Sequence, residues 1–176
     1  SKELFKELKQ KGIKKNDFIS ESSTWGKFLR SLPVAARVGK WLFCHAGMYP
    51  NLSWKVFVEQ SNKVLKTEDY ESPFLVGKDS ILMAKDWWES NEKVQSLLKR
   101  LSENDLYGVV QGHQPKAYGI KNKIGAIEGG RLIKIDNGMA PEAGQNLPSM
   151  LRFVDPLEMI HNKMPKIEVI KAGGKI

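Results

Sequence analysis

The chain has 176 residues, which is enough for one domain with a substantial core. Its hydrophobic content of 41% and charged content of 27% are globular values. No stretch approaches the roughly 18 apolar residues of a membrane span, and "SKELFKELKQKG" at the start lacks the apolar centre of a secretory signal. One cysteine, Cys44, excludes an internal disulfide framework, so we expect a soluble intracellular protein with no membrane association.

The formal net charge of +8 is concentrated at the two ends of the chain. Residues 1–15 carry six Lys and two Glu, and residues 160–176 carry four Lys and one Glu. A nucleic-acid groove would instead place basic residues among aromatic ones on the fold itself. We therefore interpret the basic ends as solvated surface or as docking segments for an acidic partner, and nucleic-acid binding is an alternative that we do not favour.

Residues 1–66 carry mostly helical patterns. Apolar spacing predicts a helix that begins at Leu4 and stops at Gly12, and a second that begins at Trp25 and ends before Pro33. A hairpin is expected next, with strands 34–38 and 41–44. A third helix, which Ser53 caps, is predicted to run to Lys66. In the third helix, Val56, Phe57, Gln60 and Val64 mark the expected inward stripe.

After a predicted loop at 69–80, the pattern changes from helix to strand. Val94, Leu97, Leu98 and Leu101 predict a helix over 91–102. The expected strands that follow are 106–112, a hairpin of 124–127 with 131–136, then 150–155 and 167–171. Because the helices come mostly first and the strands mostly last, the fold class we predict is α/β (α+β), layered, with antiparallel pairs.

Two of the three histidines share one local setting. His45 follows the apolar run "WLFC" and precedes Ala46–Gly47, and His113 follows "GVVQG". Each ends a predicted strand beside a glycine, where a sheet presents functional side chains on loops. A neutral imidazole is a common metal ligand, although a structural core histidine is the alternative for each residue. We interpret His161, in "EMIHNKMP", as a surface residue.

A third strand end adds a carboxylate. "RLIKIDNGM" places Asp136 after an alternating strand and before Asn137–Gly138. Asp136 either closes an Asx-turn or lines the same edge of the sheet as His45 and His113.

Three motifs together resemble the calcineurin-like metallophosphoesterases. "FCHAGMYP" resembles the "F-V-H-G/A-G-L-x-P" motif of that family, "VVQGHQPKAYGI" its later "G-H-T/Q" motif, and "IKIDNGM" the "I-D-x-G-M" strand that follows. The resemblance covers roughly residues 22–158 and is strongest to the Shewanella-like protein phosphatases and diadenosine tetraphosphatase-like phosphatases.

The resemblance implies the C-terminal half of a β-sandwich flanked by helices, here as one partial domain over residues 1–176. It implies a site with two divalent metal ions (Mn, Fe or Zn), for which His45 and His113 would be ligands. Gly47, Gly112, Asp136 and Gly138 would line that site. Lys85, in "DSILMAKDWW", stands where the family has a phosphate-binding arginine, and a solvated helix lysine is the alternative.

The early family motifs are missing from this sequence. "G-D-x-H-G", "G-D-x-x-D-R-G" and "G-N-H-E" do not occur, so the remaining metal ligands and the general acid are absent. Two imidazoles alone cannot hold a two-metal centre, and the half-sheet needs a partner to cover its free edge.

Three functions stay open. The chain is part of a phosphoesterase that hydrolyses phosphomonoesters of a phosphoprotein or a nucleotide, completed by a second polypeptide or by a missing N-terminal half. Alternatively, it is a non-catalytic homologue that acts as a scaffold subunit in a larger assembly, one that could contain RNA. In the third case it is an unrelated basic domain.

Overall fold

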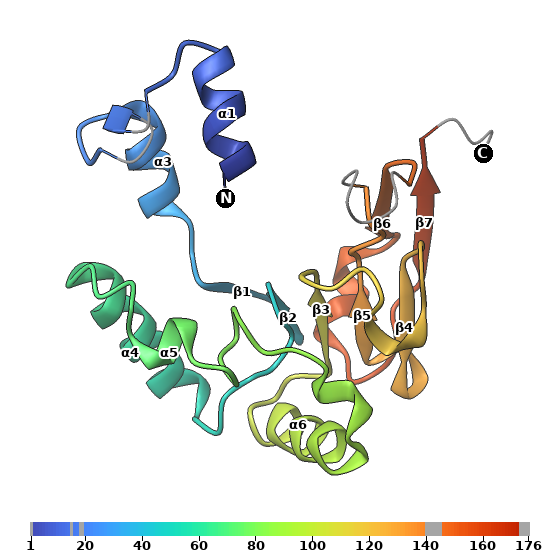
Figure 1. Ribbon diagram of the computed structural model, residues 1–176. Helices are drawn as coiled ribbons and strands as arrows, with labels where there is room; N and C mark the ends of the chain where they lie inside the picture. Colours follow the sequence, from blue (N-terminus) through green and yellow to red (C-terminus); the bar gives the residue numbers. More distant parts are fainter. Residues whose placement is uncertain (1, 15, 18–19, 140–145, 173–176) are drawn as a thin grey trace. The chain divides into compact units, whose positions relative to one another are not determined.

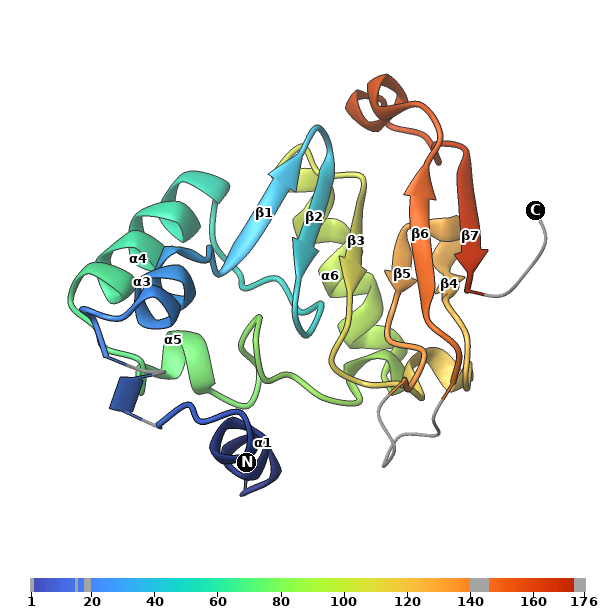
Figure 2. The same ribbon diagram turned by 90° about the horizontal axis from the view of Figure 1, so that it is seen from above.

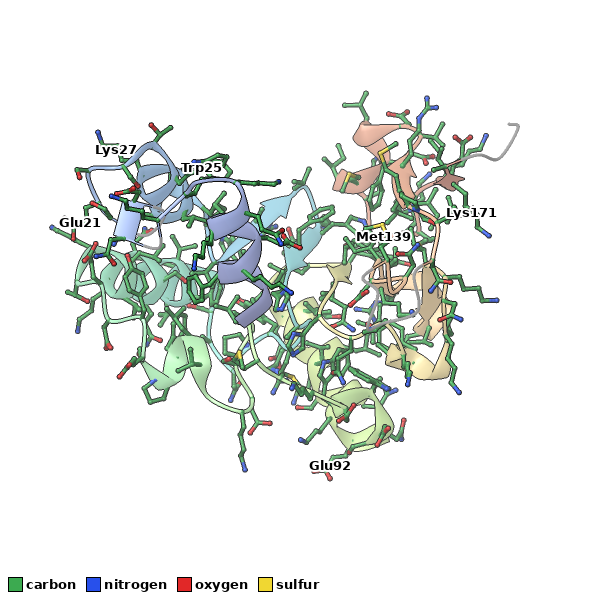
Figure 3. The ribbon with its side chains drawn as sticks, turned by 45° about the horizontal axis from the view of Figure 1, so that its top comes forward. Glu21, Trp25, Lys27, Glu92, Met139 and Lys171 are labelled. Carbon is green, nitrogen blue, oxygen red and sulfur yellow. The ribbon has the colours of Figure 1, made fainter. Side chains whose placement is uncertain are left out.

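The computed structural model describes residues 2–14, 16–17, 20–139 and 146–172 (Figure 1). The chain divides into two compact units, residues 1–33 and 34–176. Lys15 and Lys175, which belong to the basic ends, lie outside the described residues. Within the C-terminal end, Lys171 is exposed on the last strand, as Figure 3 shows.

The first unit contains α1 (Lys2–Gln10) and α3 (Thr24–Ser31), which confirms the two predicted helices. The hydroxyl of Ser23 caps α3 by accepting a hydrogen bond of 2.8 Å from the amide of Gly26. A Cβ atom at Gly26 would lie 1.8 Å from the carbonyl oxygen of Ser20, so this close approach requires glycine. The helix ends before Pro33, as expected.

The second unit holds the other helices and all the strands described. Its α-helices are α4 (Trp54–Lys66), α5 (Pro73–Val76) and α6 (Asn91–Glu103). Short 3-10 turns follow at η1 (Trp87–Glu89), η2 (Ala117–Gly119), η3 (Glu128–Gly130) and η5 (Pro156–Ile160). The hydroxyl of Ser53 caps α4, as predicted, and none of the described helices is long and apolar enough to cross a bilayer.

Two details of the predicted helices are wrong. The loop expected at 69–80 contains α5, because Pro73 is favoured in the first turn of a helix. Gln60 is exposed rather than inward, and the buried side of α4 carries Phe57, Ser61 and Val64. Ser61 can be buried because its hydroxyl donates to the carbonyl of Phe57 at 2.8 Å.

The strands form one mixed sheet and one two-stranded sheet. The mixed sheet has the order β1-β2-β3-β5-β4, with β1 (Ala35–Val38), β2 (Trp41–Cys44), β3 (Gly108–Gln111), β5 (Leu132–Lys134) and β4 (Gly125–Ile127). The three central strands are parallel, and β1 and β4 pair antiparallel at the edges. β6 (Ser149–Phe153) and β7 (Ile167–Lys171) form the second sheet. The mixed α/β class and both predicted hairpins are confirmed.

Opposite faces of the mixed sheet pack against different layers. Leu42, Val109 and Leu132 belong to a core cluster that includes Leu97 and Leu101 of α6. The alternate residues Trp41, Val110 and Ile133 pack against the β6–β7 layer, where Phe153 lies edge-on to Trp41 at 5.6 Å. Figures 1 and 2 show α6 on one side of the sheet and β6–β7 on the other. The alternation of strand side chains therefore produces a sheet that is covered on both faces.

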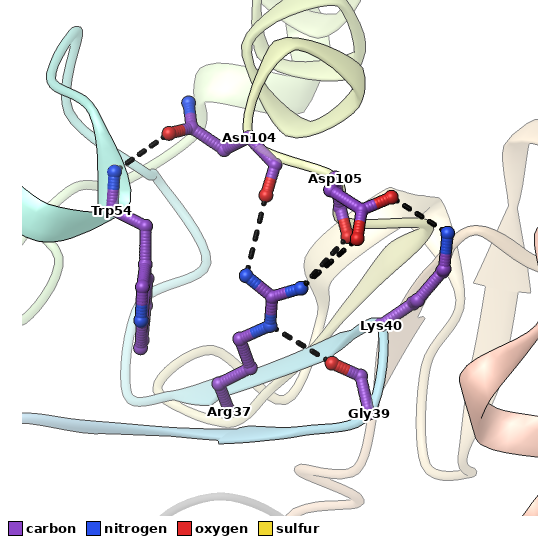
Figure 4. Close-up of polar contacts among 6 residues, drawn as sticks. All are labelled: Arg37, Gly39, Lys40, Trp54, Asn104 and Asp105. Atoms are coloured by element: carbon purple, nitrogen blue, oxygen red, sulfur yellow. Dashed lines mark hydrogen bonds and ion pairs between the residues drawn. The ribbon is translucent and has the colours of Figure 1, made fainter.

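A polar network joins the amino-terminal ends of β2, β3 and α4 (Figure 4). The carboxylate of Asp105 forms ion pairs with Nζ of Lys40 at 2.6 Å and with Nη2 of Arg37 at 3.3 Å. These cations hold the pKa of the Asp105 carboxyl below the ordinary value. Asn104, at the end of α6, accepts from the amide of Trp54 at 2.6 Å and donates to the carbonyl of Leu52 at 3.2 Å. One amide side chain thus connects α6 to the start of α4.

We predict that Asn104→Ala lowers the free energy of unfolding by about 2 kcal/mol, because it leaves the amide of Trp54 and the carbonyl of Leu52 without their partner. Urea unfolding followed by circular dichroism measures the change. Asn91→Ala is the matched control, since Asn91 is exposed in the first turn of the same helix. Equal stability of the Asn104 and Asn91 variants would contradict this role.

Candidate functional site

The parallel register brings three strand ends to one edge of the sheet. Cys44 pairs with Gln111, and Gln111 pairs with Lys134, so β2, β3 and β5 finish in the same row. His45 follows β2 directly, and His113 and Asp136 each follow their strand by two residues. The carboxyl edge of parallel strands is where open α/β sheets place ligand sites.

The two histidine side chains meet at this edge. Nε2 of His45 and Nδ1 of His113 are 2.7 Å apart, and the ring centroids are 4.5 Å apart at an interplanar angle of 65°. One nitrogen donates and the other accepts, according to the tautomers. The backbone supports the pair, because the amide of Gly112 donates to the carbonyl of His45 at 3.0 Å.

His113 has a backbone conformation that is unusual for its residue type. Its φ angle of 71° lies in the left-handed region, which costs roughly 1 kcal/mol or more for a residue with a side chain. Its Nε2 atom is buried and has no hydrogen-bond partner among the described residues. Strained backbone and unpaired buried polar atoms concentrate at functional sites.

The surroundings of His113 favour its neutral form. Burial lowers the pKa of its imidazole below the ordinary value, and the positive charges of His45 and Lys85 lower this pKa further. The carboxylate of Asp136 opposes that effect. Lys85 and Asp136 therefore both act electrostatically on His113, and a neutral imidazole is the form that binds metals.

Hydrogen bonds tie the Lys85 segment to both histidine loops. The amide of Ala46 donates to the carbonyl of Ile81 at 2.8 Å, and Nε1 of Trp87 donates back to the carbonyl of Ala46 at 2.9 Å. On the other side, the Gln114 side chain donates to the Asp86 carboxylate at 2.8 Å and accepts from its amide at 3.2 Å. Lys85 is thus fixed between residues that neighbour His45 and His113 in sequence.

Asp136 forms the Asx-turn that the sequence left open as an alternative. Its Oδ1 accepts from the amide of Gly138 at 3.1 Å, and Gly138 has a φ of 73°. The carboxylate in this turn is close enough to His113 to raise the pKa of its imidazole. Asp136 therefore closes the turn and also lies at the same edge of the sheet as the two histidines.

The two glycines beside the histidines, Gly47 and Gly112, differ in what they provide. Gly47 has a φ of 81°, and a Cβ atom there would lie 1.8 Å from Oε1 of Gln111. Glycine is thus required by both conformation and space in the turn after His45. Gly112 has more room, with only the carbonyl of His45 at 3.9 Å from an added Cβ, and it contributes its amide hydrogen bond.

Two buried polar residues beneath this edge were missed by the sequence analysis. The side chain of Lys134 is fully buried, and its Nζ donates to the carbonyls of Pro115 at 2.7 Å and Asp136 at 2.9 Å. Burial lowers the pKa of this amine, and the charge of Asp136 opposes the shift. Gln111 is 1% exposed, and its amide has no partner among the described residues. The signal for Lys134 was its inward position in the alternating strand "RLIKID".

The other singled-out residues lie apart from this chemistry. His161 is exposed, as predicted. Cys44 packs against the apolar cluster from β2, and burial raises the pKa of its thiol to about 12, so it stays protonated and weakly nucleophilic. Among the described residues, no group of three His, Cys, Asp or Glu side chains is placed to hold a metal ion.

The second unit has a layered, mixed α/β fold. The chain is similar in fold to a cold-active protein tyrosine phosphatase of the psychrophile Shewanella sp., at 15% identity and a TM-score of 0.54. Two further cold-active protein tyrosine phosphatase structures, one of them a point mutant, match at 16% identity and the same TM-score. Each match covers 76% of this chain.

The chain spans about two fifths of those phosphatases, with 41–42% of their length covered. At such low identity the likeness shows a common fold and nothing about the reaction. No family model and no curated protein matches the sequence.

We predict that the stability of the chain falls as the pH drops below about 6.5, the ordinary value for histidine, toward the lower pKa of folded His113. In this window the unfolded chain binds the proton and the folded chain does not, so protonation favours unfolding. Thermal melts of His113→Asn should show a weaker loss, because asparagine tolerates the positive φ but does not titrate. His161→Asn is the control, and a loss that is equal in all three proteins would contradict the assignment to His113.

Proposed function

We propose that this chain supplies part of the site of a metal-dependent phosphoesterase that hydrolyses phosphomonoesters, in the manner of a phosphoprotein phosphatase. The observation that carries the proposal is the histidine pair, whose ring nitrogens face each other at 2.7 Å on the carboxyl edge of parallel strands. The proposal takes its reaction class from the solved structures that are similar in fold, which are protein phosphatases. The substrate would be a phosphoprotein or a nucleotide.

The histidine pair fits a metal ion in part. Two imidazole nitrogens that bind one tetrahedral zinc ion at about 2.0–2.1 Å lie about 3.3 Å apart. The pair would therefore have to open from the observed 2.7 Å and turn both nitrogens toward the ion. The lowered pKa of His113 keeps that ligand neutral at pH 7. The described residues supply only this pair, so the remaining ligands would come from a further polypeptide or segment.

The residues of this chain would divide the work between binding and orientation. His45 and His113 would bind one of two divalent metal ions (Mn, Fe or Zn). When bound, these ions would activate water and neutralise the charge of the phosphate. Lys85 would attract the phosphate oxygens as a point charge. Gly47, Gly112 and Gly138 would keep the backbone of the edge in place, and Asp136 would balance the positive charge near His113.

A second polypeptide, or a missing N-terminal half, would complete the sheet. Among the described residues, β1 and β4 each pair on one side only. Val38 on β1 is 47% exposed and Met150 on β6 is 58% exposed. Unpaired strand edges beside exposed apolar side chains favour pairing with another chain.

The alternative is a non-catalytic scaffold subunit. The observation that favours it is the hydrogen bond between His45 and His113, because the two imidazoles already satisfy one nitrogen each without a metal. The basic ends would then dock the subunit on an acidic partner.

Metal binding and hydrolysis separate the two functions. In the natural gene product that contains this chain, we expect bound Mn, Fe or Zn and hydrolysis of p-nitrophenyl phosphate. His45→Asn and His113→Asn should each lower the metal content and reduce hydrolysis at least 100-fold, as loss of a ligand does for catalytic metals. Elemental analysis and initial rates measure both effects.

The matched control is His161→Asn, which removes an exposed imidazole from the same chain and should change neither quantity. Circular dichroism melts show whether each variant folds. If the natural protein binds no metal and has no activity while remaining folded, the scaffold alternative replaces the phosphoesterase.

The proposed partner gives a separate prediction. We expect the purified 176-residue chain to self-associate, because its strand edges are unpaired. Sedimentation velocity and a thermal melt test this directly. A monomer that melts cooperatively would show that the chain needs no second polypeptide to fold.

A further inference from the structure

Gln114 and Asp86 form two hydrogen bonds with each other, one in each direction. The side-chain amide of Gln114 donates from Nε2 to Oδ1 of Asp86 at 2.8 Å, and its Oε1 accepts from the backbone amide of Asp86 at 3.2 Å. Gln114 is the residue after His113, and Asp86 is the residue after Lys85. The pair therefore connects the loop of one histidine to the segment that carries the lysine.

Asp86 has a backbone conformation that needs support. Its φ of 52° and ψ of 16° lie in the left-handed region, which is uncommon for residues other than glycine, although aspartate and asparagine adopt it more readily than most. Gln114 binds both the amide and the carboxylate of this one residue, so it fixes the side chain relative to the backbone. The two bonds thus stabilise the left-handed conformation.

Lys85 and Asp86 are two exposed residues between two buried ones. Ala84 and Trp87 are each 1% exposed, and Nε1 of Trp87 donates to the carbonyl of Ala46 at 2.9 Å. Because the core holds both ends of this short bridge, a change in the dihedral angles of Asp86 has to be taken up by Lys85. The backbone of Asp86 therefore decides where the side chain of Lys85 lies.

The position of Lys85 matters for the histidine edge of the sheet. Its positive charge acts on His113, which places the ammonium group within electrostatic reach of that imidazole. The attraction between a point charge and a phosphate falls with distance and is screened by solvent at the surface. A displaced Lys85 would bind phosphate more weakly at this edge.

We propose that Gln114 is a positioning residue for Lys85. Its two hydrogen bonds to Asp86 would set the backbone from which Lys85 reaches a phosphate beside the histidine pair, and Gln114 itself would not touch the substrate. The effect on phosphate rests on the phosphoesterase function proposed above, whereas the effect on the conformation of Asp86 does not.

Gln114→Met tests the conformational step, because methionine has a similar length and charge but forms neither hydrogen bond. In crystal structures of the natural gene product that contains this chain, we expect φ of Asp86 to leave the left-handed region in this variant. The protein should stay folded, since Asp86 is exposed and Gln114 is only half-buried.

An exchange of the two side-chain groups gives a rescue. Gln114→Glu alone brings two carboxylates together and should also displace Asp86. Asp86→Asn in the same chain restores one amide and one carboxylate in reversed positions, so both hydrogen bonds can form again. The doubly substituted protein should regain a positive φ at position 86, at the same net charge as the wild type.

Hydrolysis of p-nitrophenyl phosphate by the natural gene product measures the consequence for the site. Gln114→Met should raise KM, and the inhibition constant of inorganic phosphate, about 10-fold, while kcat and metal content change little, because a contact made equally to bound substrate and transition state is weakened. In a protein that already carries Lys85→Met, Gln114→Met should have no further effect on either constant, since Gln114 acts through Lys85.

The matched control is Gln95→Met, which makes the same change at an exposed position of α6 and should alter neither φ of Asp86 nor the two constants. Thermal melts check that every variant is folded.

Three results would overturn the proposal. The first is an unchanged φ of Asp86 in folded Gln114→Met, and the second is no recovery of that angle in the exchanged pair. The third is an effect of Gln114→Met on KM that is as large with Lys85→Met as without it. If the natural protein has neither metal nor activity, the phosphoesterase function fails, and the crystal structures alone decide whether Gln114 holds Asp86.

Discussion

The site depends on the in-register parallel pairing of β2, β3 and β5. This pairing aligns Cys44, Gln111 and Lys134 in one row, so the residues that follow each strand leave the sheet together. His45 and His113 are 68 positions apart in sequence, yet their nitrogens are 2.7 Å apart. A slip of one residue in β3 would exchange its two faces and separate the pair, which is why the apolar packing on both sides of the sheet also fixes the site.

This arrangement places two polar side chains in the buried row beneath the histidines, which costs free energy. Gln111 is buried with an unpaired amide, and Lys134 is buried with its charge held by two backbone carbonyls. Both side chains face the same side as Val109 and Leu132, where the core would favour apolar residues. Such polar groups persist where they hold loops in place, and Lys134 holds the loops of His113 and Asp136 against each other.

The fold and the function rest on different grounds. The fold of the chain is similar to that of the cold-active protein tyrosine phosphatases, over two fifths of their length. The proposed chemistry rests on the histidine pair, with Lys85 and Asp136 acting on His113, and that set would be one part of a metal centre. A catalytic subunit completed by more polypeptide and a scaffold that retains a histidine pair both follow from the same geometry.

The sequence by itself determined the local elements and the strand-end residues. Helical stripes, Ser53 as a cap, the hairpin of strands 34–38 and 41–44, and the motifs around His45, His113 and Asp136 are all short-range signals, which depend on a few neighbouring residues. Only the tertiary structure decided that Gln60 is exposed and that Lys134 is buried. It also decided that the side chains of His45 and His113 meet. Lys134 had a local signal, its position in the alternating strand, but the contacts that bury and pair these side chains come from distant segments, which no single stretch of sequence specifies.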